Sequence, residues 1–296
     1  MTRAPFSLQD PPGEEDLMAL ESLAVAVAVE AGTLITDQRP VDLGVAATKS
    51  SDTDVVTVMD RAAETLIRQR LHQARPDDAV LGEEEGGGGP AKSGITWVVD
   101  PIDGTVNYLY DLPDYAVSIA AAVGDPSTPG TWVPVAGAVV SPRRGEVYRA
   151  RRGGGSYLVA GDRRIRLGGS GAADIAHALV GTGFGYAVQR RAWQGDIVRA
   201  VLPRVRDIRR MGSAAIDLCQ VASGRFDAFW EVGLNPWDLA AGWLICTEAG
   251  IVAGGPQAGE DPQTALTLMA APGIAVPFAD LVRSSIRAAA PLPPES

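Results

Sequence analysis

The sequence predicts an α/β protein in which helices cover a large β-sheet. Three observations indicate this class. Helical spacing of apolar residues marks the N-terminal quarter, and the middle of the chain is a series of strand-like segments separated by Gly and Pro. In the second half, short strands alternate with helices, which is typical of a further α/β layer. With 296 residues, the chain can form one large domain or two packed subdomains.

Two helices are expected near the N-terminus. Residues 17–36 are rich in Ala, Leu and Glu and form a predicted long amphipathic helix, which is followed by a loop containing Pro40. A second helix is predicted over residues 61–75 and stops at Pro76. Asp60 directly precedes it. Its carboxylate is therefore a candidate for capping this helix or for a functional role.

Acidic residues follow two of the predicted strands. Residues 79–82 form a short strand that leads into Glu83 and a glycine-rich loop, and residues 95–100 form a β-branched strand that stops at Asp100. Further strands continue the sheet, over residues 115–124, 132–141, 146–160 and 163–167. Two strand ends are thus expected to present carboxylates.

The second half is predicted to begin near Gly168. Its strands are expected within residues 178–185 and 226–232, and its helices over residues 192–207, 213–224 and 237–250. Cys219 and Cys246 fall in two of these helices and are expected to be buried free thiols. The predicted organisation is a disordered leader, two subdomains and a frayed tail, over residues 1–16, 17–167, 168–290 and 291–296.

Charge and hydropathy narrow the functional classes. The net charge of −10 disfavours binding to nucleic acid or to an anionic membrane surface. No uninterrupted apolar run reaches the roughly 18 residues that span a bilayer, and no secretory signal is evident, so a soluble cytoplasmic protein is expected. A phosphorylated substrate would be repelled too, unless carboxylates bind divalent cations that present a positive face to it.

The motif Asp100-Pro101-Ile102-Asp103-Gly104-Thr105 is the strongest candidate for such a cation site. Pro101 fixes its own φ angle and Gly104 permits a tight turn, so the carboxylates of Asp100 and Asp103 can converge around the carbonyl of Ile102. Magnesium prefers such oxygen ligands. Taken alone, the motif could also be a polar turn that caps a helix.

Two more carboxylates come from the ends of predicted elements. Glu83 follows a strand, and Asp238 lies at the start of a predicted helix. An acidic residue is favoured by the dipole at a helix N-terminus, so Asp238 also has a structural explanation. The combination with Asp100 and Asp103 favours a metal centre.

Three segments, GEE at residues 82–84, WVVDPIDGT at 97–105 and PWDLAAG at 236–242, resemble the inositol monophosphatase family in order and spacing. The resemblance extends over about residues 17–287. It implies a layered α-β-α-β-α sandwich and a magnesium-dependent, lithium-sensitive phosphatase that uses two or three Mg²⁺ ions. It also implies a homodimer.

The resemblance assigns metal ligands and catalytic groups. It implies that Glu83, Asp100 and the Ile102 carbonyl bind one ion, and that Asp100, Asp103 and Asp238 bind a second. By the same resemblance Thr105 and Glu83 activate water, and Asp60 is a supporting acid.

The resemblance also implies a set of substrate contacts. The main chain of Asp103, Gly104 and Thr105 would hold the phosphate, as amides at a helix start can. Contacts to the alcohol part and to the metal-bound phosphate are expected from Arg209, Gly212, Ser213, Ala214, Glu231 and Asp238. Arg209 and Arg210 could instead be a solvated basic pair, and the extra acid and glycines after Glu83 suggest a mobile loop.

Other phosphate-handling classes fit less well. DPIDGT contains one residue more than the D-x-D-G-T motif of haloacid-dehalogenase phosphatases, which misplaces its second acid. Residues 86–93 nearly match a phosphate-binding loop, but Ala91 replaces a required glycine. GTGFGY lacks the third glycine of a dinucleotide fingerprint, because Tyr186 stands there. His72 and His177 are the only histidines, which disfavours a zinc site or a histidine triad.

Within the family, the sequence leaves the substrate open. Inositol 1-phosphate is the first expectation, and histidinol phosphate, fructose 1,6-bisphosphate and nucleotide phosphates are alternatives. A non-catalytic member that binds a partner is the remaining possibility. The intact acidic motifs disfavour a purely structural role.

Overall fold

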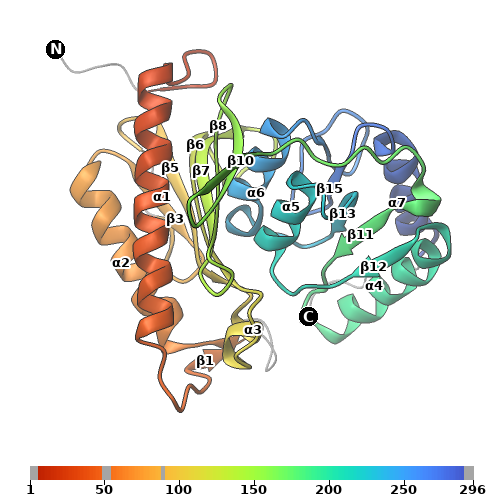
Figure 1. The fold of residues 1–296 in the computed structure, drawn as a ribbon, viewed down its shortest axis with the longest axis horizontal. Helices are drawn as coiled ribbons and strands as arrows, with labels where there is room; N and C mark the ends of the chain where they lie inside the picture. Colours follow the sequence, from red (N-terminus) through yellow and green to blue (C-terminus); the bar gives the residue numbers. More distant parts are fainter. Residues whose placement is uncertain (1–5, 49–54, 88–90, 290–296) are drawn as a thin grey trace.

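The computed structural model describes residues 6–48, 55–87 and 91–289, in which helices and two main sheets form layers (Figure 1). The helices of these residues are α1 (Glu14–Asp37), α2 (Val58–Ala74), α3 (Thr105–Leu109), α4 (Val188–Val201), α5 (Ala214–Ala222), α6 (Pro236–Glu248) and α7 (Ala275–Ala288), with 3₁₀ turns η1 (Ile175–His177) and η2 (Leu202–Arg204).

The larger sheet has eight strands in the order β10-β9-β8-β7-β6-β5-β3-β4. Its strands are β3 (Ala79–Gly82), β4 (Gly86–Gly87), β5 (Ile95–Asp103), β6 (Ala116–Gly124), β7 (Trp132–Ser141), β8 (Glu146–Arg151), β9 (Gly155–Ala160) and β10 (Arg163–Arg166). β3 and β5 run parallel, and the other neighbours run antiparallel. Only a parallel neighbour brings the carboxyl end of a second strand to the end of β5.

The smaller sheet has five strands in the order β12-β11-β13-β15-β14. These are β11 (Leu179–Thr182), β12 (Asp207–Arg209), β13 (Ala228–Glu231), β14 (Val252–Gly254) and β15 (Thr267–Ala270), and a separate pair is formed by β1 (Ala47–Thr48) and β2 (Val55–Val56). β11 is parallel to β12 and to β13, whereas β15 is antiparallel to β13 and to β14.

The helices complete a sandwich of five layers. α1 and α2 cover one face of the large sheet, and α5 and α6 lie between the two sheets and contact both. α4 and α7 pack together on the far face of the small sheet (Figure 1). The expected α-β-α-β-α fold is confirmed.

The central strands are apolar on both faces because helices cover both. In β6, Val117 and Ile119 face the core beneath α1 and α2, whereas Ala116 and Ala120 face the core shared with α6. This alternation follows the two-residue period of a strand. The expectation for the two cysteines is also confirmed, since both are buried and free.

The N-terminal segment differs from the expected disordered leader. α1 begins at Glu14, and the backbone N–H of Phe6 donates a hydrogen bond of 2.7 Å to the carbonyl of Ser93. The described part of the leader therefore packs against the body, while residues 1–5 lie outside the described residues.

One helix, α1, resembles a membrane span in composition, although Glu21 and Glu30 interrupt its apolar run. Among the described residues, this helix is long and apolar enough by composition, with a mean hydropathy of 1.7 over an 18-residue window. However, 44% of that window is buried inside the molecule, against the sheet and α2. The apolar character of α1 is thus that of a core helix, which passes the same test.

The second half contains elements that the sequence pattern did not predict. The helix expected over residues 192–207 spans Val188–Val201, because Pro203 lies in a 3₁₀ turn and the chain then enters the edge strand β12. β14, β15 and α7 were not predicted either. The expected tail at residues 291–296 lies outside the described residues.

Candidate metal centre

The DPIDGT motif forms the irregular end of β5. The pairing of β5 with β6 shifts register between Asp100 and Asp103, and the carboxylate of Asp100 accepts a hydrogen bond of 3.0 Å from the N–H of Ile102. Gly104 has a φ of 94°, and a Cβ there would lie 2.9 Å from the carbonyl of Asp114. Only glycine fits this conformation and space, so the turn from β5 into α3 is rigidly defined.

Three carboxylates from two elements meet at this turn. Ligand oxygens of Asp100, Asp103 and Asp238 all lie within 4.8 Å of one another. Asp238 comes from the first turn of α6, where its Oδ2 also accepts a 2.7 Å hydrogen bond from the N–H of Asn235. Asp238 therefore completes the capping box of α6 and also joins the carboxylate cluster.

Glu83 reaches the same cluster from the neighbouring strand. In the parallel pair of β3 and β5, Gly82 lies opposite Val99, so Glu83 follows beside Asp100. A side-chain hydrogen bond joins Glu83 to Asp100 and raises the pKa of Asp100. The topology thus brings together the four carboxylates that the sequence singled out.

The electrostatics of this cluster favour a bound cation. Burial raises the pKa of Asp100, and the negative charges of Glu83, Asp103 and Asp238 raise it further. Burial, followed by the charges of Glu83 and Asp103, raises the pKa of Asp238 as well. Carboxylates that repel one another in a buried site are stabilised by a divalent ion, and hard oxygen ligands suit magnesium or calcium. The donor set therefore fits the expected metal.

Asp103 is held from the opposite side by the start of α5. Its Oδ2 accepts hydrogen bonds of 2.6 Å from the hydroxyl of Ser213 and of 2.6 Å from the N–H of Ala215. Burial raises the pKa of Asp103 to about 6, although these donors and the amide of Ala214 lower it. Ser213 and Ala214, expected to contact substrate, thus have a direct role in orienting Asp103. Gly212 lies beside them.

Thr105 is linked to Asp60 at the end of the motif. The Thr105 hydroxyl lies 3.0 Å from Asp60 Oδ1 and 3.0 Å from the carbonyl of Ile102. Asp60 Oδ2 accepts hydrogen bonds from the backbone N–H and hydroxyl of Thr57, at 2.8 and 2.5 Å. Thr57, rather than Asp60, is the N-cap of α2, and Asp60 completes the capping box as its third helical residue.

The arginine pair occupies two different environments. Arg209 donates to Asp207 at 2.6 Å, and its side chain is 46% exposed. Arg210 instead lowers the pKa of Asp103, Asp217 and Glu231 by its positive charge. The expectation that Arg209 belongs to the site is therefore not supported by its contacts, and Arg210 is the arginine that faces the carboxylates.

Glu231 lies at the end of β13, against the backbone of Gly183, whose Cβ would fall 2.1 Å from Glu231 Oε2. Burial, with the charge of Asp103, raises the pKa of Glu231 to about 8. Asp217, on α5, is also buried and is influenced by Glu231 and Asp103. Glu231, Asp217 and Arg210 thus form a second group of ionisable side chains beside the carboxylate cluster.

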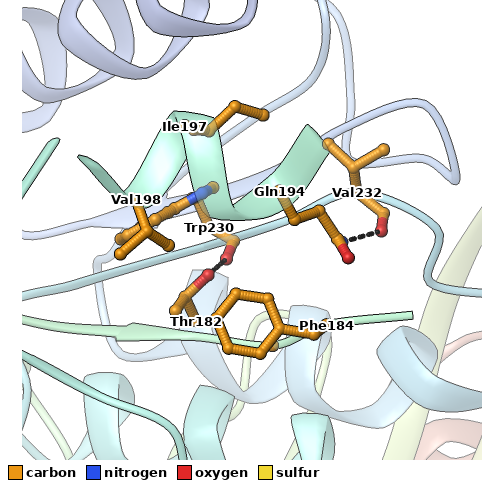
Figure 2. Close-up of a pocket in the computed structure, with 8 residues that line it drawn as sticks. Thr182, Phe184, Gln194, Ile197, Val198, Trp230 and Val232 are labelled. Carbon is orange, nitrogen blue, oxygen red and sulfur yellow. Dashed lines mark hydrogen bonds between the residues drawn. The ribbon is translucent and has the colours of Figure 1, made fainter. Parts of the chain in front are cut away.

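A small pocket lies on the other face of β13. Trp230 and Val232 line it together with α4 residues such as Gln194, whose Nε2 donates to the Val232 carbonyl (Figure 2). Because adjacent strand residues point to opposite faces, Glu231 points away from this pocket. The pocket is therefore separate from the carboxylate cluster.

Sequence reasoning missed several residues that shape the site. Asn107 donates hydrogen bonds to the carbonyls of Asp114 (2.6 Å) and Met211 (2.8 Å), which ties α3 to the loop before α5. Glu64, on α2, binds the loop after Glu83. For both residues, the available signal in the sequence was a polar side chain among apolar ones. Their partners could not be predicted, because Met211 is 104 residues from Asn107 and Glu84 is 20 residues from Glu64.

The fold and site together define a layered α/β protein with a buried carboxylate cluster that could bind a cation. The sequence model of the Inositol monophosphatase family matches residues 16–286, and the chain belongs to this family. Membership supports a phosphatase function.

Individual relatives agree with this assignment. Inositol-1-monophosphatase of Mycobacterium bovis is 45% identical over 273 residues, which cover 86% of this chain and 90% of that protein. The solved structure of Mycobacterium tuberculosis SuhB is similar with a TM-score of 0.75 and 41% identity, and the match covers 90% of this chain and 97% of that one. The Nus factor SuhB of Escherichia coli (strain K12) is 38% identical over 230 residues, covering 77% and 82% of the two chains.

Proposed function

We propose that the protein is a Mg²⁺-dependent phosphatase that hydrolyses a small polyol phosphate, with myo-inositol 1-phosphate as the first candidate. The observation that carries this proposal is the convergence of the Asp100, Asp103 and Asp238 carboxylates within 4.8 Å. The inositol-1-monophosphatase name of the 45% identical M. bovis relative supports the substrate.

The proposed ligands are Glu83, Asp100, the Ile102 carbonyl, Asp103 and Asp238, which would hold two or three ions. Bound magnesium supplies a Lewis acid for phosphoryl oxygens and lowers the pKa of coordinated water. The protein's own contribution is to bring the carboxylates together and to orient them. Asp103 is oriented by Ser213 and Ala215.

Thr105 and Glu83 are the proposed groups that orient and deprotonate the attacking water. Asp60 accepts a hydrogen bond from the Thr105 hydroxyl and so fixes its orientation. The Asp60 carboxylate is itself held by the backbone N–H of Thr57 in the capping box of α2. The main chain from Asp103 to Thr105 is the proposed phosphate contact, at the point where the chain enters α3.

The polyol part is proposed to lie against Glu231 and Arg210. A carboxylate that accepts and a guanidinium that donates hydrogen bonds suit a ring bearing several hydroxyl groups. In this proposal Arg210 takes the place expected for Arg209, because Arg209 is paired with Asp207. Gly212, Ser213 and Ala214 would border this part of the substrate.

Phosphate release tests the proposal. The substrates are inositol 1-phosphate, histidinol phosphate, fructose 1,6-bisphosphate and phosphoadenosine phosphate, each with and without Mg²⁺. We expect Mg²⁺-dependent turnover of inositol 1-phosphate that is lost in Asp100→Asn and kept in Asp174→Asn, an exposed aspartate bonded to His177. Preference for another phosphate would change the substrate, and no turnover of any would overturn the enzymatic proposal.

A partner-binding role is the second candidate. It is favoured by the E. coli relative, which is named a Nus factor and is 38% identical. The intact carboxylate cluster favours catalysis, and inactivity of the parent chain on every substrate would favour the partner-binding role.

We further propose that the protein is a cytoplasmic homodimer, that lithium inhibits it and that it does not bind a membrane. Sedimentation analysis tests the dimer.

A further inference from the structure

Helix α2 carries a buried ion pair that binds the loop immediately after Glu83. The Glu64 side chain is fully buried, and its carboxylate accepts hydrogen bonds from the N–H of Glu84 (2.8 Å) and of Glu85 (3.1 Å). A carboxylate that binds two consecutive backbone amides fixes the path of that backbone. Glu64 thus determines how the chain leaves Glu83.

Arg68 completes this arrangement one helical turn further along α2. Its guanidinium binds Glu64 Oε1 through Nε (2.8 Å) and Nη2 (2.7 Å), and Nη2 also donates a 2.6 Å hydrogen bond to the Gly86 carbonyl. Arg68 Nε lies 3.4 Å from Glu85 Oε2. Glu64 and Arg68 together therefore bind backbone amide and carbonyl groups of residues 84–86. The positive charge of Arg68 also balances the buried negative charge of Glu64.

The residue before Glu83 is shaped to the same pair. A Cβ on Gly82 would lie 2.3 Å from Glu64 Oε1 and 2.7 Å from Arg68 Nη2. Glycine is therefore needed for β3 to approach the pair this closely. Glu83 is held between two neighbours, Gly82 and Glu84, that both contact Glu64.

The strand itself provides little support for this loop. β3 has four residues and its outer neighbour β4 has two, so Glu83 sits near the edge of the sheet. The proposed metal ligands Asp100 and Asp103, in contrast, follow a long buried strand. Among the proposed ligands at strand ends, Glu83 is therefore the one that receives the least support from its own strand.

We propose that Glu64 and Arg68 are positioning residues that hold the Glu83 carboxylate in place for divalent cation binding. This inference rests on the proposed function, because it assigns Glu83 to the metal site. Outer groups that orient a metal ligand typically change affinity 10–100-fold when removed. A pair with a merely structural role would change stability and leave metal affinity unchanged.

The test compares Glu64→Gln with Glu21→Gln in the full-length protein. Glu21 is a matched control, since it is also buried and binds two arginines, Arg149 (2.6 Å) and Arg151 (3.0 Å), on the large sheet. Mg²⁺ affinity is measured by isothermal titration calorimetry and thermal stability by circular dichroism. Both variants are expected to melt earlier than the parent. Only Glu64→Gln should bind Mg²⁺ about 10–100-fold more weakly.

Two further variants keep the test decisive if Glu64→Gln does not fold. Arg68→Lys retains the charge but loses the forked contact to Glu64 and Gly86, and Gly82→Ala adds one methyl group at the close approach. Each is expected to weaken Mg²⁺ binding at least tenfold. Amide hydrogen exchange of Glu84 and Glu85, measured without metal, should become faster in both variants.

The outcomes separate this inference from the proposed function. If the parent chain gives no Mg²⁺ binding, the proposed function fails and the inference fails with it. If the parent and Glu21→Gln bind Mg²⁺ and the folded Glu64 or Arg68 variants bind it within twofold of the parent, the positioning role is overturned while the metal site stands.

Discussion

Asp217 is a buried carboxyl group on α5 whose Oδ1 has no hydrogen-bond partner among the described residues. Burial raises its pKa, and the charges of Glu231 and Asp103 raise it further, against a smaller lowering by Arg210. A raised pKa means that the folded chain binds this proton more tightly than the unfolded chain. The stability that Asp217 contributes is complete below its unfolded pKa and is lost as pH rises through the folded pKa.

We therefore expect Asp217→Asn to stabilise the metal-free protein at pH 8. The neutral amide avoids the cost of ionising a buried group and removes the repulsion from Glu231 and Asp103, and these are the causes that raise the pKa of Asp217. Unfolding free energies from urea titrations in EDTA, at pH 5 and pH 8, measure the effect. The variant should exceed the parent at pH 8, and the difference should shrink toward pH 5. Equal pH dependence in parent and variant would contradict this account.

At the residue scale, the sequence predicted the convergence of the carboxylates more successfully than it predicted the residues around them. Asp100 and Asp103 follow a strand of recognisable pattern, and Glu83 follows its parallel neighbour, so strand ends alone brought them together. Arg210 could not be distinguished from Arg209, because the edge strand β12, which ends at Arg209, was not predicted.

The start of α2 connects helix formation to the site. The Thr57 hydroxyl accepts a hydrogen bond from the N–H of Met59 at 3.2 Å and donates to Asp60, which in turn binds Thr105. One cap therefore stabilises the helix and orients a proposed catalytic hydroxyl. Its loss should affect stability and turnover together.

We expect Thr57→Ala to lower the unfolding free energy by about 1 kcal/mol, the usual value of an N-cap, and to lower Mg²⁺-dependent phosphate release. Thr57→Ser keeps the hydroxyl and should restore both. Thermal melts and initial rates measure the two effects. A Thr57→Ala variant with full turnover would separate the cap from the site, and Thr65→Ala, which alters an exposed hydroxyl on the same helix, is the control.

At the element scale, most long segments were predicted, whereas the shortest strands and the long helix α7 were not. α1, α2 and the central strands extend over enough residues for an apolar period to be visible. β12 and β14 have three residues each and exist because a neighbouring strand pairs with them. α7 does carry helical spacing at Phe278 and Val282, but a proline in its first turn resembles a loop signal.

The central helical layer unites the two halves of the molecule. α5 and α6 belong to one hydrophobic core that includes strands of the large sheet and Phe229 and Met269 of the small sheet. Trp132 on β7 also packs edge-on against Trp243 on α6, with ring centroids 5.4 Å apart. Because α5 and α6 cover the inner faces of both sheets, displacing these helices from one sheet would also expose the apolar face of the other.

We therefore expect the metal-free protein to unfold in a single transition. Differential scanning calorimetry should give a calorimetric enthalpy close to the van't Hoff enthalpy, and far- and near-ultraviolet circular dichroism should change together. Two resolved transitions would instead indicate that the predicted units, residues 17–167 and 168–290, unfold independently.

The candidate metal centre draws its carboxylates from both halves of the chain. Asp100 and Asp103 end a strand of the large sheet, whereas Asp238 begins α6, and the groups that orient Asp103 begin α5. During synthesis on the ribosome, the first of these carboxylates emerge long before the last. A nascent chain can therefore complete this site only after most of the polypeptide has been released from the exit tunnel.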